Sequence, residues 1–260
     1  MTWRHAIGYF RKYHTDYDGP YLSHLIAPEL YPFTSSMESS VYKGPAGIDP
    51  AHTDVYAFGT YTGGSLVEIV ESFNTIRCPM RKFFGFDSFE GMPEETDEEH
   101  VYEAQPYWRK GNYDSREHFG VSTVEDSMVK TRELVEPHMS KESELVLIPG
   151  FFENVLDDEC TKKYDMRPAA YIDVDVDIYA SSKTVLEFVF ANNIAVEGTI
   201  IGLDDWGGSP GWETMSDGQS RAFREVGLKY NVVFEQLMAV GTAFPHIQVL
   251  ARVKSVGGRV

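Results

Sequence analysis

The sequence predicts an α/β fold with a doubly wound, mostly parallel sheet of seven strands that closes in a C-terminal antiparallel hairpin. From residue 54 onward, short apolar runs alternate with segments of helical periodicity, as in successive βα units. Several runs end in glycine or aspartate, which is typical of strand ends that border a ligand crevice. Only residues 239–245 separate the last two runs. That connection is too short for a helical crossover and therefore indicates a hairpin.

The individual elements follow from these patterns in chain order. Strands are expected at 54–58, 82–87, 144–149, from 169 onward, and at 198–203, 231–237 and 246–253. Helices are expected at 3–13, 66–73, 122–136, 181–192 and 214–229. Ser122 and Glu125 have capping-box spacing, which places the start of one helix at Ser122. Residues 1–50 are weakly periodic and are expected to form a cap or a homodimer arm, with residues 51–260 as the main domain.

Composition narrows the classes of partner and the compartment. The formal charge of −17 argues against nucleic-acid and anionic-membrane partners, which require basic patches. No apolar run approaches a membrane span, and the N-terminus lacks the apolar core of a signal peptide. Cys78 and Cys160 are too few for a disulfide framework or a zinc site. A cytoplasmic location is therefore expected.

An acidic and aromatic stretch follows the second predicted strand. Its length and polarity predict a lid at residues 94–118, because loops this long in compact domains are usually functional or mobile. His100 and His118 flank it. The aromatic residues within it either line an acceptor pocket or shield the core from solvent; they are Tyr102, Tyr107, Trp108 and Tyr113.

Aspartates gather at the ends of two predicted strands. Asp173, Asp175 and Asp177 alternate with apolar residues from Ile172 to Ile178, so an extended chain would place the acids on one face. Asp204 and Asp205 follow the next strand. Clustered carboxylates are costly unless a cation or protons neutralise them, and all-oxygen ligands favour Mg²⁺. The expected ligands are Asp175, Asp204 and Asp205, with Asp177 as the alternative to Asp175. In the other interpretation, one aspartate caps a helix and the rest are solvated.

Two further features are consistent with a cofactor site. The loop Gly59-Thr-Tyr-Thr-Gly-Gly-Ser65 between a strand and a helix lets backbone N–H groups approach a ligand, although it also suits an ordinary turn. Asp87 ends the second strand, where it either accepts hydrogen bonds from both ribose hydroxyls of an adenosine cofactor or caps a helix.

Four segments, in order, resemble the macrocin O-methyltransferase family of S-adenosylmethionine-dependent enzymes, which methylate sugar hydroxyls of natural products. The most specific segment is Phe86-Asp-Ser-Phe-Glu-Gly-Met-Pro93. The others are the glycine loop at 59–65, the segment Ile148-Pro-Gly-Phe-Phe-Glu-Asn-Val-Leu156, and the pair Asp175-Val-Asp-Ile-Tyr-Ala-Ser181 and Asp204-Asp-Trp206. The resemblance spans roughly residues 54–226. Ala57, Pro149 and Val176 depart from the family pattern, which has Glu, Lys and Gly at these positions.

The resemblance implies a Rossmann-like class I methyltransferase fold with S-adenosylmethionine in the crevice and Mg²⁺ beside it. The cofactor-binding residues that it implies are Gly59, Thr60, Gly63, Gly64, Ser65, Asp87, Ser88, Gly150 and Phe151. Asp175, Asp204 and Asp205 would hold Mg²⁺, and Asp175 would also serve as the catalytic base. The acceptor would be a small hydroxylated molecule such as a glycoside.

Two other functions fit the residues themselves. A glycosyltransferase also uses Asp-x-Asp to hold the metal of a sugar nucleotide, but it needs basic or backbone contacts to the diphosphate. Lys183 is the only basic residue within ten residues after the motif. A binding protein that kept the fold without activity is the third hypothesis, motivated by Ala57 and Val176.

Overall fold

A computed structural model describes residues 52–75, 78, 80–95, 108–206, 218–240 and 248–257 of the chain, without the side chains of 75 and 238–240. The expected cap or dimer arm at 1–50, with its helix at 3–13, lies outside these residues, as do residues 96–107 of the expected lid. No helix in the described ranges is long and apolar enough to cross a membrane.

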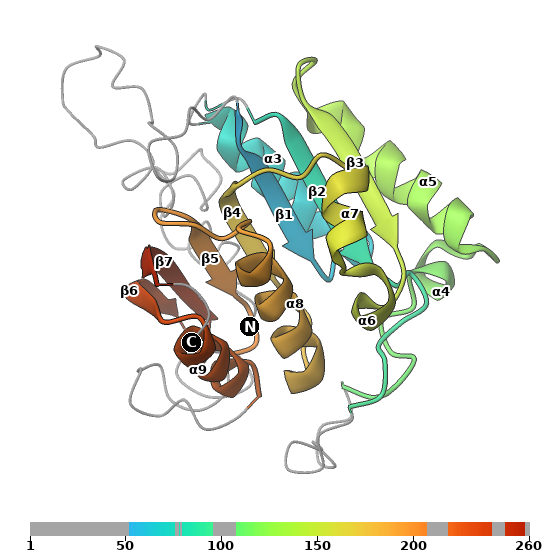
Figure 1. The fold of residues 1–260 in the computed structure, drawn as a ribbon. Coiled ribbons are helices and arrows are strands. Elements are labelled where there is room, and N and C mark those ends of the chain that lie inside the picture. The colour runs from blue at the N-terminus through green and yellow to red at the C-terminus, as the bar shows by residue number, and fades with distance from the viewer. Residues whose placement is uncertain are drawn as a thin grey trace.

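The central element is a seven-stranded sheet of order β3-β2-β1-β4-β5-β7-β6 (Figure 1). Its strands are β1 Asp54–Phe58, β2 Lys82–Asp87, β3 Glu144–Pro149, β4 Ala169–Val174, β5 Ile200–Leu203, β6 Val232–Val240 and β7 Gln248–Val256. The first five strands are parallel, β7 runs antiparallel to β5, and β6 runs antiparallel to β7. The predicted fold class and the closing hairpin are confirmed.

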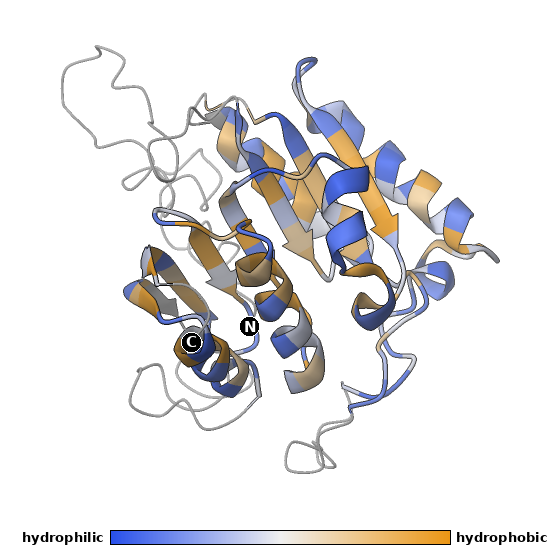
Figure 2. Ribbon diagram, viewed as in Figure 1, coloured by the Kyte–Doolittle hydropathy of each residue, from blue (hydrophilic) through white to orange (hydrophobic). Residues whose placement is uncertain are grey.

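Helices cover both faces of this sheet (Figure 1). They are α3 Gly64–Thr75, α4 Ser115–Phe119, α5 Val124–Val135, η4 Glu136–His138, α6 Phe152–Val155, α7 Asp158–Lys163, α8 Tyr179–Ala191 and α9 Gly218–Lys229. Alternate residues of β1 enter two separate cores. Val55 and Ala57 pack with α3, whereas Tyr56 and Phe58 pack on the side of α8 and α9. Figure 2 shows the apolar strands enclosed between helices whose outer faces are hydrophilic.

Stacked aromatic rings stiffen β1 and β2 beneath the crevice. Tyr56 stacks on Phe84 at 4.9 Å and Phe58 on Phe86 at 4.6 Å between ring centroids. The strands are paired in register at both positions. Each such pair is worth about 0.5–1.5 kcal/mol beyond its buried area. The two strand ends that begin the glycine loop and carry Asp87 therefore rest on a well-packed base.

Two local expectations were wrong. The extended run does not continue to Ile178, because β4 ends at Val174 and Asp177 takes a left-handed φ of +63° before α8 begins. The α5 N-cap is Thr123 rather than Ser122. The Thr123 hydroxyl accepts the backbone N–H of Asp126 at 3.0 Å. An N-cap side chain accepts from the second or third residue of its helix, and Asp126 is the third residue after Thr123, so the helix starts one residue later than expected.

Three short helices were also not expected. The stretch after β2, where a lid was expected, ends in α4, whose N-cap is Asp114. Neither α6 nor α7 was predicted, because four and six residues are too few to show helical periodicity.

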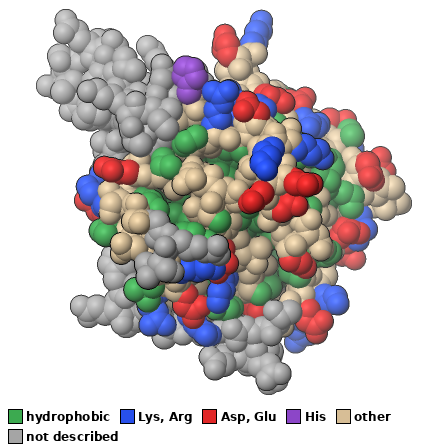
Figure 3. All heavy atoms as spheres, in the orientation of Figure 1, with side chains coloured by type: hydrophobic (Ala, Val, Ile, Leu, Met, Phe, Trp, Pro, Cys, Tyr) green, Lys and Arg blue, Asp and Glu red, His purple; other side chains and the backbone are tan. Residues whose placement is uncertain are grey.

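Charged side chains of both signs are interspersed over the face drawn in Figure 3.

Candidate active site

The carboxyl ends of the parallel strands surround a cavity of about 350 Å³. The loops after β1, β2, β3, β4 and β5 all contribute to its wall, as expected for a ligand crevice in an open α/β sheet. Gly59, Asp87, Ser88, Gly150, Phe151, Asp175, Asp204 and Asp205 are the sequence-predicted residues that line it.

Gly59 forms the tightest part of this wall. Its φ is +82°, and its backbone N–H donates to the carbonyl of Phe86 at 2.9 Å. A Cβ added there would lie 1.7 Å from the carbonyl oxygen of Asp175. Only glycine permits both the left-handed conformation and this approach. The turn after β1 therefore fixes the distance between the carboxyl ends of β1 and β4.

Asp87 is held by the backbone on both carboxylate oxygens. One oxygen accepts the N–H of Phe89 and the other accepts the N–H of Tyr61, each at 2.7 Å. Burial raises the pKa of Asp87 to about 6, although these two hydrogen bonds oppose the shift. Each carboxylate oxygen has two lone pairs, so the group retains acceptor capacity toward the cavity.

The remaining predicted cofactor residues divide into two groups. Ser88 also lines the cavity, and its hydroxyl donates to the carbonyl of Gly91 at 2.7 Å. Thr60 and Ser65 are buried off the cavity wall, with hydroxyls that have no hydrogen-bond partner within the described ranges. Gly63 faces α5, since a Cβ there would lie 2.8 Å from Cγ2 of Thr131, and Gly64 starts α3 in open space.

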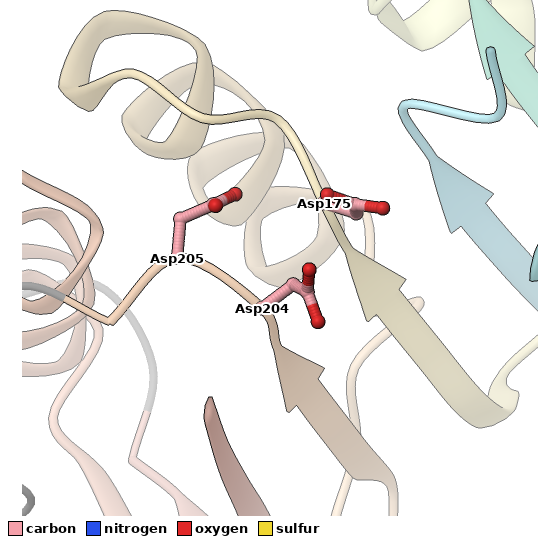
Figure 4. Close-up of side chains that lie close together, drawn as sticks. All are labelled: Asp175, Asp204 and Asp205. Carbon is pink, nitrogen blue, oxygen red and sulfur yellow. The ribbon is translucent and has the colours of Figure 1, made fainter. Parts of the chain in front are cut away.

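The three acids expected to bind metal are brought together. Carboxylate oxygens of Asp175, Asp204 and Asp205 lie within 4.8 Å of one another at the ends of β4 and β5 (Figure 4). Asp204 and Asp205 are buried. An all-carboxylate donor set of this size matches the oxygen preference of Mg²⁺. The residues present therefore fit a divalent cation.

Two buried glutamines secure this cluster, and the sequence did not single them out. Gln219 accepts the N–H of Asp205 at 3.1 Å and donates to the carbonyl of Val174 at 3.0 Å. Gln248 donates through Nε2 to Oδ1 of Asp204. Neither glutamine belongs to a recognisable motif. The one available signal was register, because an antiparallel last strand begins beside the end of β5.

Asp177 lines the same cavity but is held differently. Its backbone N–H donates to Oδ2 of Asp205 at 2.9 Å, and its side chain accepts a hydrogen bond from Trp108. Burial and the nearby charge of Asp175 raise the pKa of Asp177 well above its usual range. Val176 needs no positive φ, so this departure from glycine costs the backbone no strain.

Aromatic side chains form another part of the cavity wall. Tyr61, Trp108 and Tyr113 line the cavity. The ring of Tyr61 meets that of Tyr113 edge-on at 5.8 Å, and its hydroxyl contacts Nδ1 of His118 at 3.2 Å. Burial, together with Asp177 and Asp205, raises the pKa of Tyr113 to about 12. Tyr102 and Tyr107 lie outside the described residues, and Tyr61 was not singled out from the sequence.

Strained backbone concentrates around this cavity. Seven non-glycine residues among those described have a left-handed φ: Asp165, Asn193 and Asn231, which do not line the cavity, and Tyr61, Phe89, Tyr113 and Asp177. Three of these line the cavity, and Phe89 is adjacent to Ser88. Each such residue costs of the order of 1–3 kcal/mol and persists where the surrounding structure fixes it, commonly at functional sites. Tyr61, Phe89 and Tyr113 are residue types that rarely adopt this conformation, and their strained backbone is consistent with a functional crevice.

Comparison with known proteins identifies the class. CalS11, a calicheamicin methyltransferase, has a TM-score of 0.55 and 21% identity, with 77% of this chain and 72% of that chain covered. The O-methyltransferase NovP has a TM-score of 0.51 and 18% identity, covering 77% and 71%. These likenesses show the fold, which is that of class I methyltransferases. Among curated protein sequences, none matches the chain.

The family follows from the sequence itself. The model of the macrocin-O-methyltransferase (TylF) family matches residues 48–226, which is more than half of the chain. The chain belongs to this family and is a methyltransferase. The expected resemblance is confirmed, and the glycosyltransferase alternative is set aside.

Proposed function

We propose that the protein is a Mg²⁺-dependent O-methyltransferase that uses S-adenosylmethionine to methylate a hydroxyl of a sugar or another small natural product. The observation that carries the proposal is that Asp87 and the acid cluster open into one cavity. A donor held at the first and an acceptor held at the second would meet there. Membership of the macrocin-O-methyltransferase family and the likeness to a calicheamicin methyltransferase support the choice of acceptor.

The cofactor half of the cavity has the chemistry that an adenosyl group requires. Asp87 offers acceptors for both ribose hydroxyls, and Gly59 borders the space proposed for the methionine end. Gly150 and Phe151 border the same space. The roles of Thr60, Gly63, Gly64 and Ser65 in the proposed site are indirect: they shape the turn and the start of α3.

In the metal half, Asp175, Asp204 and Asp205 would hold Mg²⁺. When bound, the cation would make an acceptor hydroxyl more acidic by the same Lewis-acid effect that acidifies water. Asp175 is the proposed proton acceptor, with Asp177 as the alternative on the same wall. The aromatic wall would orient the acceptor and exclude water, which is chiefly a positioning task.

The proposal includes a lid at residues 94–118. The described ends of this segment support it, because Met92 exchanges backbone hydrogen bonds with Gly111 and Asn112 at 3.0 and 2.8 Å. These bonds close a loop whose two ends, at Pro93 and Trp108, line the cavity. Residues 96–107 lie outside the described ranges. Hydrogen exchange tests the lid, since strong protection of this segment without ligand would contradict it.

A cytoplasmic location and a homodimer arm at residues 1–50 complete the proposal. Both rest on sequence features alone. Size-exclusion chromatography with light scattering on the full chain and on a chain lacking residues 1–50 tests the arm. A dimer in the first and a monomer in the second is the expected result.

Thermal shift tests the proposed chemistry directly, because a ligand that binds the native state stabilises it by mass action. We expect S-adenosylhomocysteine to raise the melting temperature, and Mg²⁺ to raise it further. Stabilisation by a sugar nucleotide with Mn²⁺ instead would point to glycosyl transfer. No response to any of these ligands would favour a protein that kept the fold without catalysis.

A further inference from the structure

The first residue of β7 lies beside the metal cluster because that strand is antiparallel. Parallel strands end at the crevice, whereas an antiparallel neighbour begins there. Leu203 of β5 pairs with Val249 of β7, so the next position in register places Asp204 opposite Gln248. Cross-strand neighbours in such a pair are within side-chain reach. Gln248 lies beyond residue 226, where the family match ends.

The two ends of the Gln248 amide are in different situations. A carboxylate oxygen only accepts hydrogen bonds, and Nε2 of Gln248 accordingly donates to Oδ1 of Asp204. Oε1 is buried and has no hydrogen-bond partner among the described residues, in a side chain that is only 4% exposed. A buried acceptor without a partner is costly and rare, and it calls for an explanation such as an ion or a water.

Gln219 provides the contrast within the same site. It is fully buried, and both ends of its amide are used, on the carbonyl of Val174 and on the N–H of Asp205. Its hydrogen bonds go to the backbone, so it holds β4 and the β5 end together whether or not a cation is present. Gln248, in contrast, donates to the carboxylate of Asp204, which is a proposed metal ligand. Its Oε1 has no hydrogen-bond partner among the described residues.

We propose that Gln248 is a positioning residue of the metal centre, whose amide N–H fixes the Asp204 carboxylate and whose Oε1 accepts a hydrogen bond from a water of hydrated Mg²⁺. Mg²⁺ dehydrates reluctantly and usually keeps several waters, each a hydrogen-bond donor. Groups that orient metal ligands typically change metal affinity 10–100-fold when removed. The inference rests on the proposed function, because it requires the cation at Asp175, Asp204 and Asp205.

The test compares Gln248→Met with a matched control, Gln236→Met. Methionine keeps the length of the side chain and removes both hydrogen-bonding ends. Gln236 lies in β6 of the same hairpin, opposite Ala251 and away from the acids. Titration calorimetry would measure the affinities for Mg²⁺ and for S-adenosylhomocysteine. For Gln248→Met we expect Mg²⁺ binding to weaken about 10–100-fold, with S-adenosylhomocysteine affinity within about twofold of wild type. The control should change neither affinity.

A second variant, Gln248→Glu, tests the same proposal, because Mg²⁺ should stabilise it more strongly than the wild type. It places a further carboxylate beside Asp204, which should lower the melting temperature without metal. Mg²⁺ neutralises the added charge, so its stabilising effect should exceed that in the wild type.

The outcomes separate this inference from the proposed function. Absence of Mg²⁺ binding by the wild type would refute the proposed metal site and the inference with it. Mg²⁺ binding by the wild type and equal binding by Gln248→Met would overturn the inference alone. Equal loss of both affinities, or loss of the fold in both variants, would assign Gln248 a purely structural role and also overturn it.

Discussion

The two halves of the crevice are built in different ways. In the cofactor half, the backbone sets the geometry: Gly59 turns left-handed against the Asp175 carbonyl, and two backbone N–H groups fix Asp87. In the metal half, side chains do so: three aspartates converge, and Gln219 and Gln248 hold them from α9 and β7. Backbone geometry tolerates few substitutions, so it leaves a compact motif in the sequence. A cluster of side chains is instead assembled from segments that are far apart in the sequence.

The largest expected effect comes from breaking the backbone half. Gly59→Ala would place a Cβ on the Asp175 carbonyl in a left-handed conformation. We expect it to lower the free energy of unfolding by about 3 kcal/mol or more, from strain and overpacking together. Gly64→Ala is the matched control, because no atom lies within 4 Å of its added Cβ. Denaturant unfolding measures both, and equal stabilities would contradict the role assigned to Gly59.

A substitution in the metal half should weaken metal binding without changing the stability of the fold or the affinity for the cofactor. Asp204→Asn removes one charge from the proposed metal site while keeping its shape. We expect Mg²⁺ affinity to fall at least about 100-fold, since a direct ligand matters no less than the groups that orient it. Calorimetry would compare it with Asp158→Asn, a change on the exposed side of α7. Unchanged Mg²⁺ affinity in Asp204→Asn would remove this residue from the site.

A pH titration sharpens the difference between the halves. The pKa of Asp87 is raised to about 6, and ribose hydroxyls donate better to the ionised form. Affinity for S-adenosylhomocysteine should therefore be full above pH 7 and fall by about tenfold on going from pH 7 to pH 5, because the protonated carboxyl must release one proton in order to bind. Asp87→Asn should bind more weakly and show a flatter profile. A wild-type affinity that stays constant over this range would contradict the assignment.

The smallest expected effect on stability concerns α5, which packs against the glycine loop but does not line the cavity. Thr123→Ala removes the α5 N-cap and should cost about 1 kcal/mol of stability. Ser122→Ala, at the position first expected to cap, should be nearly neutral. Neither change should alter binding of S-adenosylhomocysteine or Mg²⁺. A larger loss in Ser122→Ala, measured by thermal or denaturant unfolding, would reverse the observed cap assignment.

What the sequence allowed us to predict follows the same division. The alternation of strands and helices and the closing hairpin were predictable because apolar runs, glycine turns and strand-tip acids repeat along the chain. The acid cluster was predictable because parallel neighbours end at the same edge. Gln219 and Gln248 were not, because their roles depend on register between segments far apart in sequence. The helix caps and the end of β4 depended on single hydrogen bonds and on one left-handed residue, Asp177.

The central claim is that one crevice holds a sulfonium donor and a divalent cation side by side. A crystal structure of the protein with S-adenosylhomocysteine and Mn²⁺, with anomalous diffraction to locate the metal, tests it most directly. The account predicts an anomalous peak among Asp175, Asp204 and Asp205, and ribose hydroxyls on the carboxylate of Asp87. A metal peak elsewhere, or an adenosyl group bound away from Asp87, would contradict it.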